Sequence, residues 1–206
     1  MIQIKHKETG EVLFEGEADS LAGKKLVGKN FKGADFSGLV LRKCVFDSDN
    51  LNGCIFNKSD LEGASFLGAS LKEVDFSHAN LTDSNLTDAV MIGSNLSHAN
   101  LTRAKLRYAK MEECDLSNAR CVEADLSMAD LRCNLENANL TRADVRGANL
   151  VNANLTNAKI DDADFTDADM LGAKLEGTLI DRAKNVCTKH KPFKAKKSPW
   201  WKVWAS

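Results

Sequence analysis

The feature that most constrains this chain is a five-residue period of apolar residues along most of its length. From Phe36 an apolar residue recurs at every fifth position to Leu131, a four-residue step reaches Leu135, and the period resumes to Ile180. These steps define 30 centres, all of them apolar. Two positions before each centre stands a small residue, which is Ala in 19 cases, Cys in four and Ser in three; the exceptions are Leu39, Asp49, Val74 and Thr178.

A five-residue period fits neither a strand, which alternates every second residue, nor a helix, which needs spacings of three and four. A unit with one large and one small apolar position needs a turn in every repeat, so each unit forms one short side of a wide coil. The large and small residues point inward, and the other three face solvent. Coils of this kind stack by parallel pairing about 4.8 Å apart, and none buries its apolar face without neighbours.

The phenylalanines indicate how many sides the coil has. They alternate with leucine at the first nine centres, standing at Phe36, Phe46, Phe56, Phe66 and Phe76. A coil made of four units stacks them on two opposite sides, whereas a coil made of three units scatters them over all sides. The sequence therefore favours a square coil.

These units resemble the pentapeptide-repeat family, whose motif is Ala-Asp/Asn-Leu-x-x. The motif is seen at residues 79–81, 99–101, 148–150 and 153–155, and the resemblance covers roughly residues 20–180. It implies an all-β fold, a right-handed quadrilateral parallel β-helix, and the handedness rests on the resemblance alone. Degenerate centres at Leu21, Leu26 and Phe31 extend the solenoid to about eight coils over residues 21–180.

The segments outside the repeat are expected to cover its ends, because an open β-helix exposes unpaired edges. Residues 1–20 are expected to form a β-hairpin cap, since apolar residues flank the turn sequence at 8–10. The four-residue step predicts a tightened or kinked corner near Arg132 and Cys133.

Residues 181–206 form a basic, Trp-rich tail that contains Trp200, Trp201 and Trp204. Ser198-Pro199 is typical of a helix start, so a short helical segment is expected. Three roles stay open: a plug on the last coil, a homodimer contact through the tryptophans, or a contact with an anionic membrane. The segment is short, so a membrane role is not expected.

The charge is distributed unevenly along the chain. The net charge is −1, but residues 31–180 carry 23 acidic and 15 basic side chains, and residues 181–206 carry one acidic and eight basic. The first residues lack the apolar region of a secretory signal, no stretch approaches 18 apolar residues, and the six cysteines include no C-x-x-C pair. Reduced thiols in the cytoplasm are therefore expected.

Several groups of side chains are candidates for contacts or chemistry. His78 and His98 should stack on one side, but two ligands are too few for a metal site, so no metal and no cofactor is expected. The cysteines at 44, 54, 114 and 133 occupy the small inward position, and Cys187 is the one thiol expected to be reachable. A candidate protein contact comprises Val90, Ile92, Val151, Leu171, Trp200, Trp201 and Trp204; a candidate acidic surface comprises Asp161, Asp162, Asp164, Asp167 and Asp169; a basic belt comprises Arg103, Lys105, Arg107, Lys110 and Arg120.

The sequence contains no phosphate-binding loop, nucleophile elbow or metalloprotease motif, and a convex rod offers no obvious cleft. We therefore expect a non-enzymatic scaffold that binds a protein partner, with no direct nucleic acid binding. The family resemblance implies an alternative, because some members are acidic rods that mimic DNA, bind gyrase or topoisomerase and protect it from inhibitors.

Overall fold

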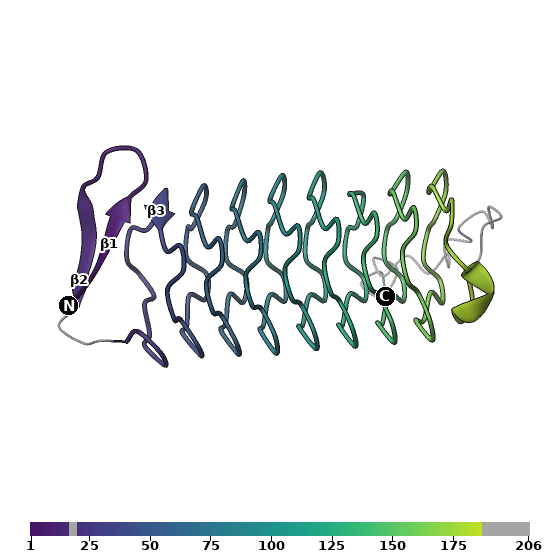
Figure 1. The fold of residues 1–206 in the computed structure, drawn as a ribbon, viewed down its shortest axis with the longest axis horizontal. Coiled ribbons are helices and arrows are strands. Elements are labelled where there is room, and N and C mark those ends of the chain that lie inside the picture. The colour runs from purple at the N-terminus through teal and green to yellow at the C-terminus, as the bar shows by residue number, and fades with distance from the viewer. Residues whose placement is uncertain (17–19, 187–206) are drawn as a thin grey trace, which may run out of the picture.

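The computed structural model describes residues 1–16 and 20–186 of the chain. These residues form one rod of stacked coils, with a β-hairpin at the N-terminal end and a single turn of 3-10 helix at the other (Figure 1). No helix in these ranges is long and apolar enough to cross a membrane.

Successive coils pair in parallel, and each bridge joins positions that lie four repeat units apart. Asn80 bridges to Asn100, and Asn100 bridges to Arg120, in the same sense. Four five-residue units therefore make one coil, which confirms the square coil and the β-helix solenoid. Its four sides are named here by their centres: side 1 holds Phe36, Phe56 and Phe76; side 2 holds Leu41, Leu61 and Leu81; side 3 holds Phe46, Phe66 and Leu86; side 4 holds Leu51, Met91 and Met111.

A tight turn closes each five-residue unit at a corner. In the unit of Leu96, the N–H of Ala99 donates to the carbonyl of Leu96 at 3.0 Å, and His98 has a φ of 59°. The side chain of Asn95 accepts the N–H of Ser97 at 3.0 Å. Asx side chains therefore satisfy the corner backbone, as expected for turns.

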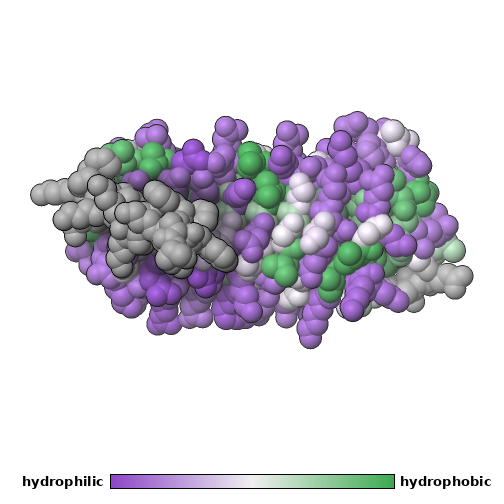
Figure 2. Space-filling model, turned by 180° about the vertical axis from the view of Figure 1, so that it is seen from behind, coloured by the Kyte–Doolittle hydropathy of each residue, from purple (hydrophilic) through white to green (hydrophobic). Residues whose placement is uncertain are grey.

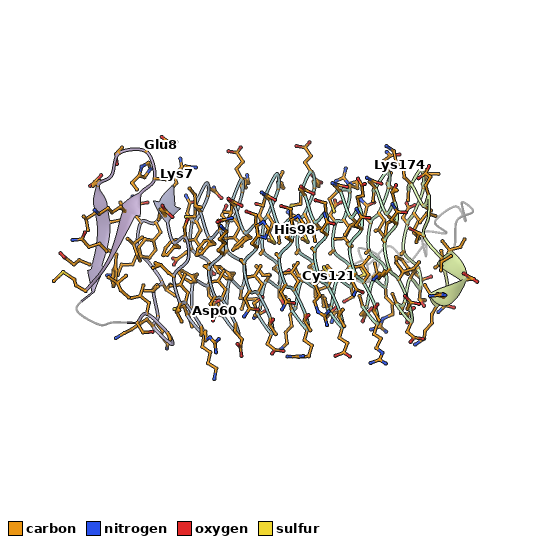
Figure 3. The ribbon with its side chains drawn as sticks, in the orientation of Figure 1. Lys7, Glu8, Asp60, His98, Cys121 and Lys174 are labelled. Atoms are coloured by element: carbon orange, nitrogen blue, oxygen red, sulfur yellow. The ribbon has the colours of Figure 1, made fainter. Side chains whose placement is uncertain are left out.

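The inward side chains fill a continuous shaft (Figure 3). Phe36 and Phe56 stack with centroids 4.6 Å apart, as do Phe46 and Phe66 at 5.0 Å. Phe56 also meets Phe46 edge-on at 5.9 Å across the shaft. The predicted ladders on two opposite sides are thus confirmed. The added centres at Leu21, Leu26 and Phe31 are buried as well.

The four-residue step produces a tightened corner. The bridge from Asp115 to Asn134 spans one residue fewer than the bridges of the preceding coils, and the full spacing returns from Asn134 to Asn154. The N–H of Cys133 donates to the carbonyl of Leu131 at 2.8 Å, two residues back rather than the usual three. One corner residue is absent, and the stacking continues beyond it.

The N-terminal end is covered by the hairpin. Strand β1 (Ile2–His6) pairs antiparallel with β2 (Val12–Gly16) and also with β3 (Ala34–Asp35) in the first coil. Ile4 is fully buried, and the ring of Phe14 meets that of Phe31 edge-on at 6.2 Å. The hairpin therefore extends both the sheet and the core.

The C-terminal end differs from the expectation that every centre is buried. The 3-10 helix η1 (Ile180–Arg182) follows the last coil, and its Ile180, the last centre, is 40% exposed while Leu179 is 52% exposed. Among the described residues no further coil stacks on this side, which is why these side chains reach solvent. The expected helical segment and Trp200, Trp201 and Trp204 lie outside the described residues, as does Cys187.

Candidate protein-contact surface

The four apolar residues proposed for a contact lie on side 4, but they do not form one patch. Val151 and Leu171 are on adjacent coils, joined by the bond from the Asn152 N–H to the Leu171 carbonyl at 2.9 Å. Val90 and Ile92 lie further towards the N-terminus and are only partly exposed. The side chains of Glu112 and Arg132, which form an ion pair with each other, stand between the two groups. The four side chains share side 4, as expected, but they form two separate groups.

An exposed methionine that the sequence analysis missed lies at the corner of side 4 opposite to that of Val151 and Leu171. Met128 is 51% exposed at the corner between sides 3 and 4, with a φ of 61°. On the preceding coil the same corner holds Tyr108, which is 44% exposed. Both are outward residues of ordinary repeats. The one signal in the sequence is that a large apolar or aromatic residue stands at a corner where most repeats have a polar residue or glycine.

The next coil offers a hollow beside Met128 because its corner residue is Gly147. A Cβ on Gly147 would lie 2.5 Å from the Met128 Sδ, so the thioether sits where any larger residue would clash. The hollow has a volume of about 410 Å³, and its lining includes Arg107, Asp144, Arg146 and Asp167. It is an open depression on a convex surface.

The five aspartates of the candidate acidic surface do not act as one group. Asp167 occupies the same corner as Met128 and Gly147, and Asp169 lies on side 4 beside Leu171. Asp161 pairs with Arg182 at 3.1 Å. Asp162 and Asp164 line a second hollow of about 550 Å³ together with Arg142, Arg146 and Lys184. Asp169, whose carboxylate accepts the N–H of Leu171 at 3.1 Å, therefore lies beside Leu171, and Asp167 stands at the opposite corner of side 4.

Arginines neutralise carboxylates elsewhere on these coils. Arg146 donates two hydrogen bonds to Asp144, at 2.8 and 2.6 Å, and these bonds hold the pKa of Asp144 below its usual value. Arg132 bonds Asp130 in the same way, with the same direction of pKa shift. The acidic excess of this region is therefore interrupted by ion pairs.

Together these residues define what we call the C-terminal contact surface: Met128, Gly147, Val151, Asp167, Asp169 and Leu171. Residues 167–171 run along side 4 from the corner of Asp167 to the corner of Leu171, and so connect the two corners of this surface. Seen from behind, the rod has small apolar areas among mostly polar residues (Figure 2). Methionine and leucine flanked by carboxylates on a rigid frame can contact an apolar and basic partner.

The two histidines stack as expected, but in a geometry that opposes chelation. The rings of His78 and His98 are 4.8 Å apart and 2° from parallel. A metal lies in the plane of each imidazole that binds it, and stacked parallel planes do not converge on one ion. The described residues include no group of three metal-binding side chains.

The basic belt is partly neutralised. Arg103 makes two bonds of 2.7 Å to Asp83, and Arg120 donates to the hydroxyl of Thr102 at 3.1 Å. The guanidinium of Arg107 lies 4.9 Å from the ring centroid of Tyr108. The belt therefore belongs to the side-chain network of the rod.

The inward cysteines are packing residues. The thiols of Cys54 and Cys114 each donate to a backbone carbonyl at 2.9 Å, and burial raises the pKa of each to about 12. Cys121, a centre on side 2, is fully buried, and burial likewise raises its pKa to about 12. Thiols of this kind are poor nucleophiles.

The geometry is matched by a known family. The family model "Pentapeptide repeats" matches eight copies between residues 30 and 172, in the segments 30–68, 50–83, 69–107, 84–120, 94–132 and 133–172. The chain therefore belongs to the pentapeptide-repeat family. No curated protein sequence matches it.

Solved structures of the same family resemble parts of the chain. A pentapeptide repeat protein from the thylakoid lumen of Arabidopsis thaliana is 28% identical, over 55% of this chain and 68% of its own, with a TM-score of 0.40. HetL, involved in heterocyst differentiation regulation in the cyanobacterium Nostoc, is 29% identical over 73% of each chain, with a TM-score of 0.25. QnrB1, a plasmid-mediated fluoroquinolone resistance protein, is 20% identical over 76% of this chain and 86% of its own, with a TM-score of 0.48.

Proposed function

We propose that this protein is a non-enzymatic scaffold that binds a protein partner, in the cytoplasm, through the C-terminal contact surface. The observation that carries the proposal is the exposure of Met128 and Leu171 at the two corners that bound side 4, a rigid side that also presents Asp167 and Asp169. Exposed methionine and leucine side chains are unfavourable in water, and their burial in an interface is favourable. The carboxylates favour a partner segment with lysine or arginine.

Two features support a binding role rather than catalysis. The two hollows are open depressions lined by charged side chains, whereas catalytic groups with shifted pKa values usually converge in a cleft. The thiols of the described residues are buried with raised pKa values. Neither feature supplies an activated nucleophile.

Capture from the native host tests the proposal. The variant Met128→Lys/Leu171→Lys places positive charge on the surface without touching the core, and Leu67→Lys is the control, because Leu67 is 40% exposed on an N-terminal coil. A protein retained by the wild type and by the control but lost from the double variant supports the proposal. A partner retained equally by all three places binding elsewhere and refutes it.

DNA mimicry is the second candidate, and the charge of the C-terminal coils favours it: residues 111–176 carry 14 acidic and six basic side chains. The ion pairs of Arg132, Arg142 and Arg146 weigh against it, because they interrupt the rows of carboxylates. A supercoiling assay with DNA gyrase, with and without a quinolone, separates the two. If micromolar protein neither inhibits gyrase nor protects it from the quinolone, DNA mimicry is ruled out.

A further inference from the structure

The first coil carries four exposed lysines along sides 3 and 4 at the N-terminal end of the rod, and residues 20–34 hold no acidic residue. Lys25 bridges to Val45 on the next coil, which places it on side 3. Two of the lysines stand at positions that are inward on the next coil, where Cys44 and Asp49 are buried; here they are exposed because no described coil stacks on them. An exposed valine stands among them. Together they form what we call the lysine surface: Lys24, Lys25, Val27, Lys29 and Lys32.

The lysine surface keeps its positive charge unpaired. Among the described residues no ion pair joins one of these lysines to a carboxylate. On the next coil Asp49 accepts the N–H of Gly28 at 2.8 Å, and Asp47 accepts that of Leu67 at 3.0 Å, so both carboxylates bond backbone rather than a lysine. With the two acidic residues outside the described ranges counted, residues 17–34 hold four basic and two acidic side chains, a net charge of +2.

The C-terminal contact surface has the opposite chemistry. Met128 and Asp167 stand at one corner of side 4, Leu171 stands at the other, and Asp169 lies between them, all exposed. Residues 111–176 carry 14 acidic and six basic side chains, a net charge of −8, and the arginines beside this surface are already bonded to aspartates. Lysine stems and an exposed valine suit the apolar side chains, and the ammonium groups suit the carboxylates.

The two surfaces of one molecule are too far apart to meet. Gly28 and Met128 occupy the same corner of the coil, with residues 48, 68, 88 and 108 on the four coils between them. At about 4.8 Å per coil, about 24 Å of rod separates them. The backbone bonds between these coils are continuous, so the end of the rod does not fold onto its own side. Only a second molecule brings the two surfaces together.

We propose that the partner of the C-terminal contact surface is a second copy of this chain, which docks through its lysine surface. The N-terminal end of one rod then meets the side of the next, with Val27 against Met128 and lysines opposite Asp167 and Asp169. This inference rests on the proposed function, because it names the partner of the same surface. The contact joins two different surfaces, so each molecule keeps one of them free and association is open-ended.

Sedimentation velocity of the full chain tests the proposal. We expect the mean mass to rise with protein concentration in dilute salt and to return to that of the monomer in molar salt, which shortens the Debye length to about 3 Å. The variant Lys25→Gln/Lys29→Gln/Lys32→Gln should weaken association about ten-fold or more.

The matched control is Lys58→Gln/Lys159→Gln/Lys174→Gln. It makes the same change of charge at exposed positions around sides 1 and 2, away from both surfaces. Its association should equal that of the wild type.

A mixing experiment then identifies the two surfaces. Met128→Lys/Leu171→Lys alters the contact surface and keeps the lysine surface, and the triple lysine variant does the reverse. Each variant alone should stay monomeric. An equimolar mixture should form a one-to-one complex and nothing larger, because each variant has one usable surface.

Three results would overturn the inference. A wild type that stays monomeric at high concentration in dilute salt would show that the copies do not bind each other. Equal weakening by the control and by the triple lysine variant would assign the effect to net charge. A mixture that stays monomeric while the wild type associates would place the contact elsewhere. Capture from the native host tests the proposed function separately: a host protein lost only from Met128→Lys/Leu171→Lys supports that function even if the wild type is monomeric.

Discussion

The two ends of the rod hold their cores in different ways. At the N-terminal end, phenylalanines stack along two sides and a hairpin buries Ile4 over the first coil. At the C-terminal end the core is mostly leucine and alanine, and Leu179 and Ile180 are exposed. Each coil of a solenoid depends on its neighbours, so we expect the covered end to be the more stable. What covers the other end decides how much of the rod opens locally.

The largest expected effect on stability is that of Phe56→Ala, which tests the aromatic end of the rod. The ring of Phe56 stacks on Phe36 and Phe76 and meets Phe46 and Phe66 edge-on, so its loss leaves a cavity between four rings. We expect a loss of about 3–5 kcal/mol in the free energy of unfolding, measured by urea denaturation with circular dichroism. Leu116→Ala, on the same side in the C-terminal half, is the matched control. A larger loss for Leu116→Ala would contradict the view that the aromatic coils are the stronger ones.

Removal of the hairpin contact should have a smaller and local effect. Ile4→Ala should cost about 2–3 kcal/mol, the low end for a buried isoleucine, because the end of the rod can relax. Hydrogen exchange should show faster opening of the amides that join the hairpin to the first coil, such as that of Lys7, which donates to the Gly33 carbonyl. Ile2→Ala, at a partly buried site, is the control. Equal acceleration along the whole rod would show that the hairpin is not a local cover.

One residue inserted between Arg132 and Cys133 tests whether the short corner separates the two halves. It restores a five-residue unit at a solvent-facing corner, and such insertions are well tolerated; we expect a change within about 1 kcal/mol. Insertion between Asp130 and Leu131 is the control, because it turns the next inward side chain outward and should cost far more. Similar losses for both insertions would mean that the tightened corner is itself required.

The smallest expected effect is a loss of stability of the C-terminal coils at acid pH. The pKa of Asp130 and that of Asp144 are lowered, first by hydrogen bonds from Arg132 and Arg146. A carboxyl whose folded pKa lies below its unfolded value stabilises the fold above the unfolded pKa, and this contribution is lost as the pH falls through the folded pKa. Protection from hydrogen exchange should therefore fall in the C-terminal coils as the pH drops below about 3.8. Arg146→Gln should reduce this dependence, and an unchanged pH profile would show that the pairs contribute nothing.

The sequence predicted the fold in detail because one period carries it. Inward residues such as Leu101 and Ala99 repeat with the coil, and Phe spacing alone distinguished four sides from three. The five-residue period does not show which coil lacks a neighbour stacked on it, so the exposure of Ile180 was not predicted. Handedness stays a prediction from the family resemblance.

The candidate site was predicted less well, for a physical reason. Outward positions accept almost any residue, so Met128 resembled its neighbours in the sequence. Its importance depends on Gly147, which lies a whole coil further along the chain, and no local motif joins the two. Val151 and Leu171 were found because both are aliphatic at equivalent positions. Glu112 and Arg132 separate Val151 and Leu171 from Ile92. Both are plain in the sequence, but their position between the two apolar groups is clear only when every residue of side 4 is assigned to its coil.

The corner that lacks one residue has a consequence for comparing this chain with other solenoids. Past Arg132, residue number and position in the coil are offset by one, so Leu135 takes the place that counting in fives would give to Glu136. An alignment that keeps strict multiples of five would exchange core and surface for the last third of the rod. Conservation scored in that frame would then mistake structural leucines for contact residues, and a binding surface for a core.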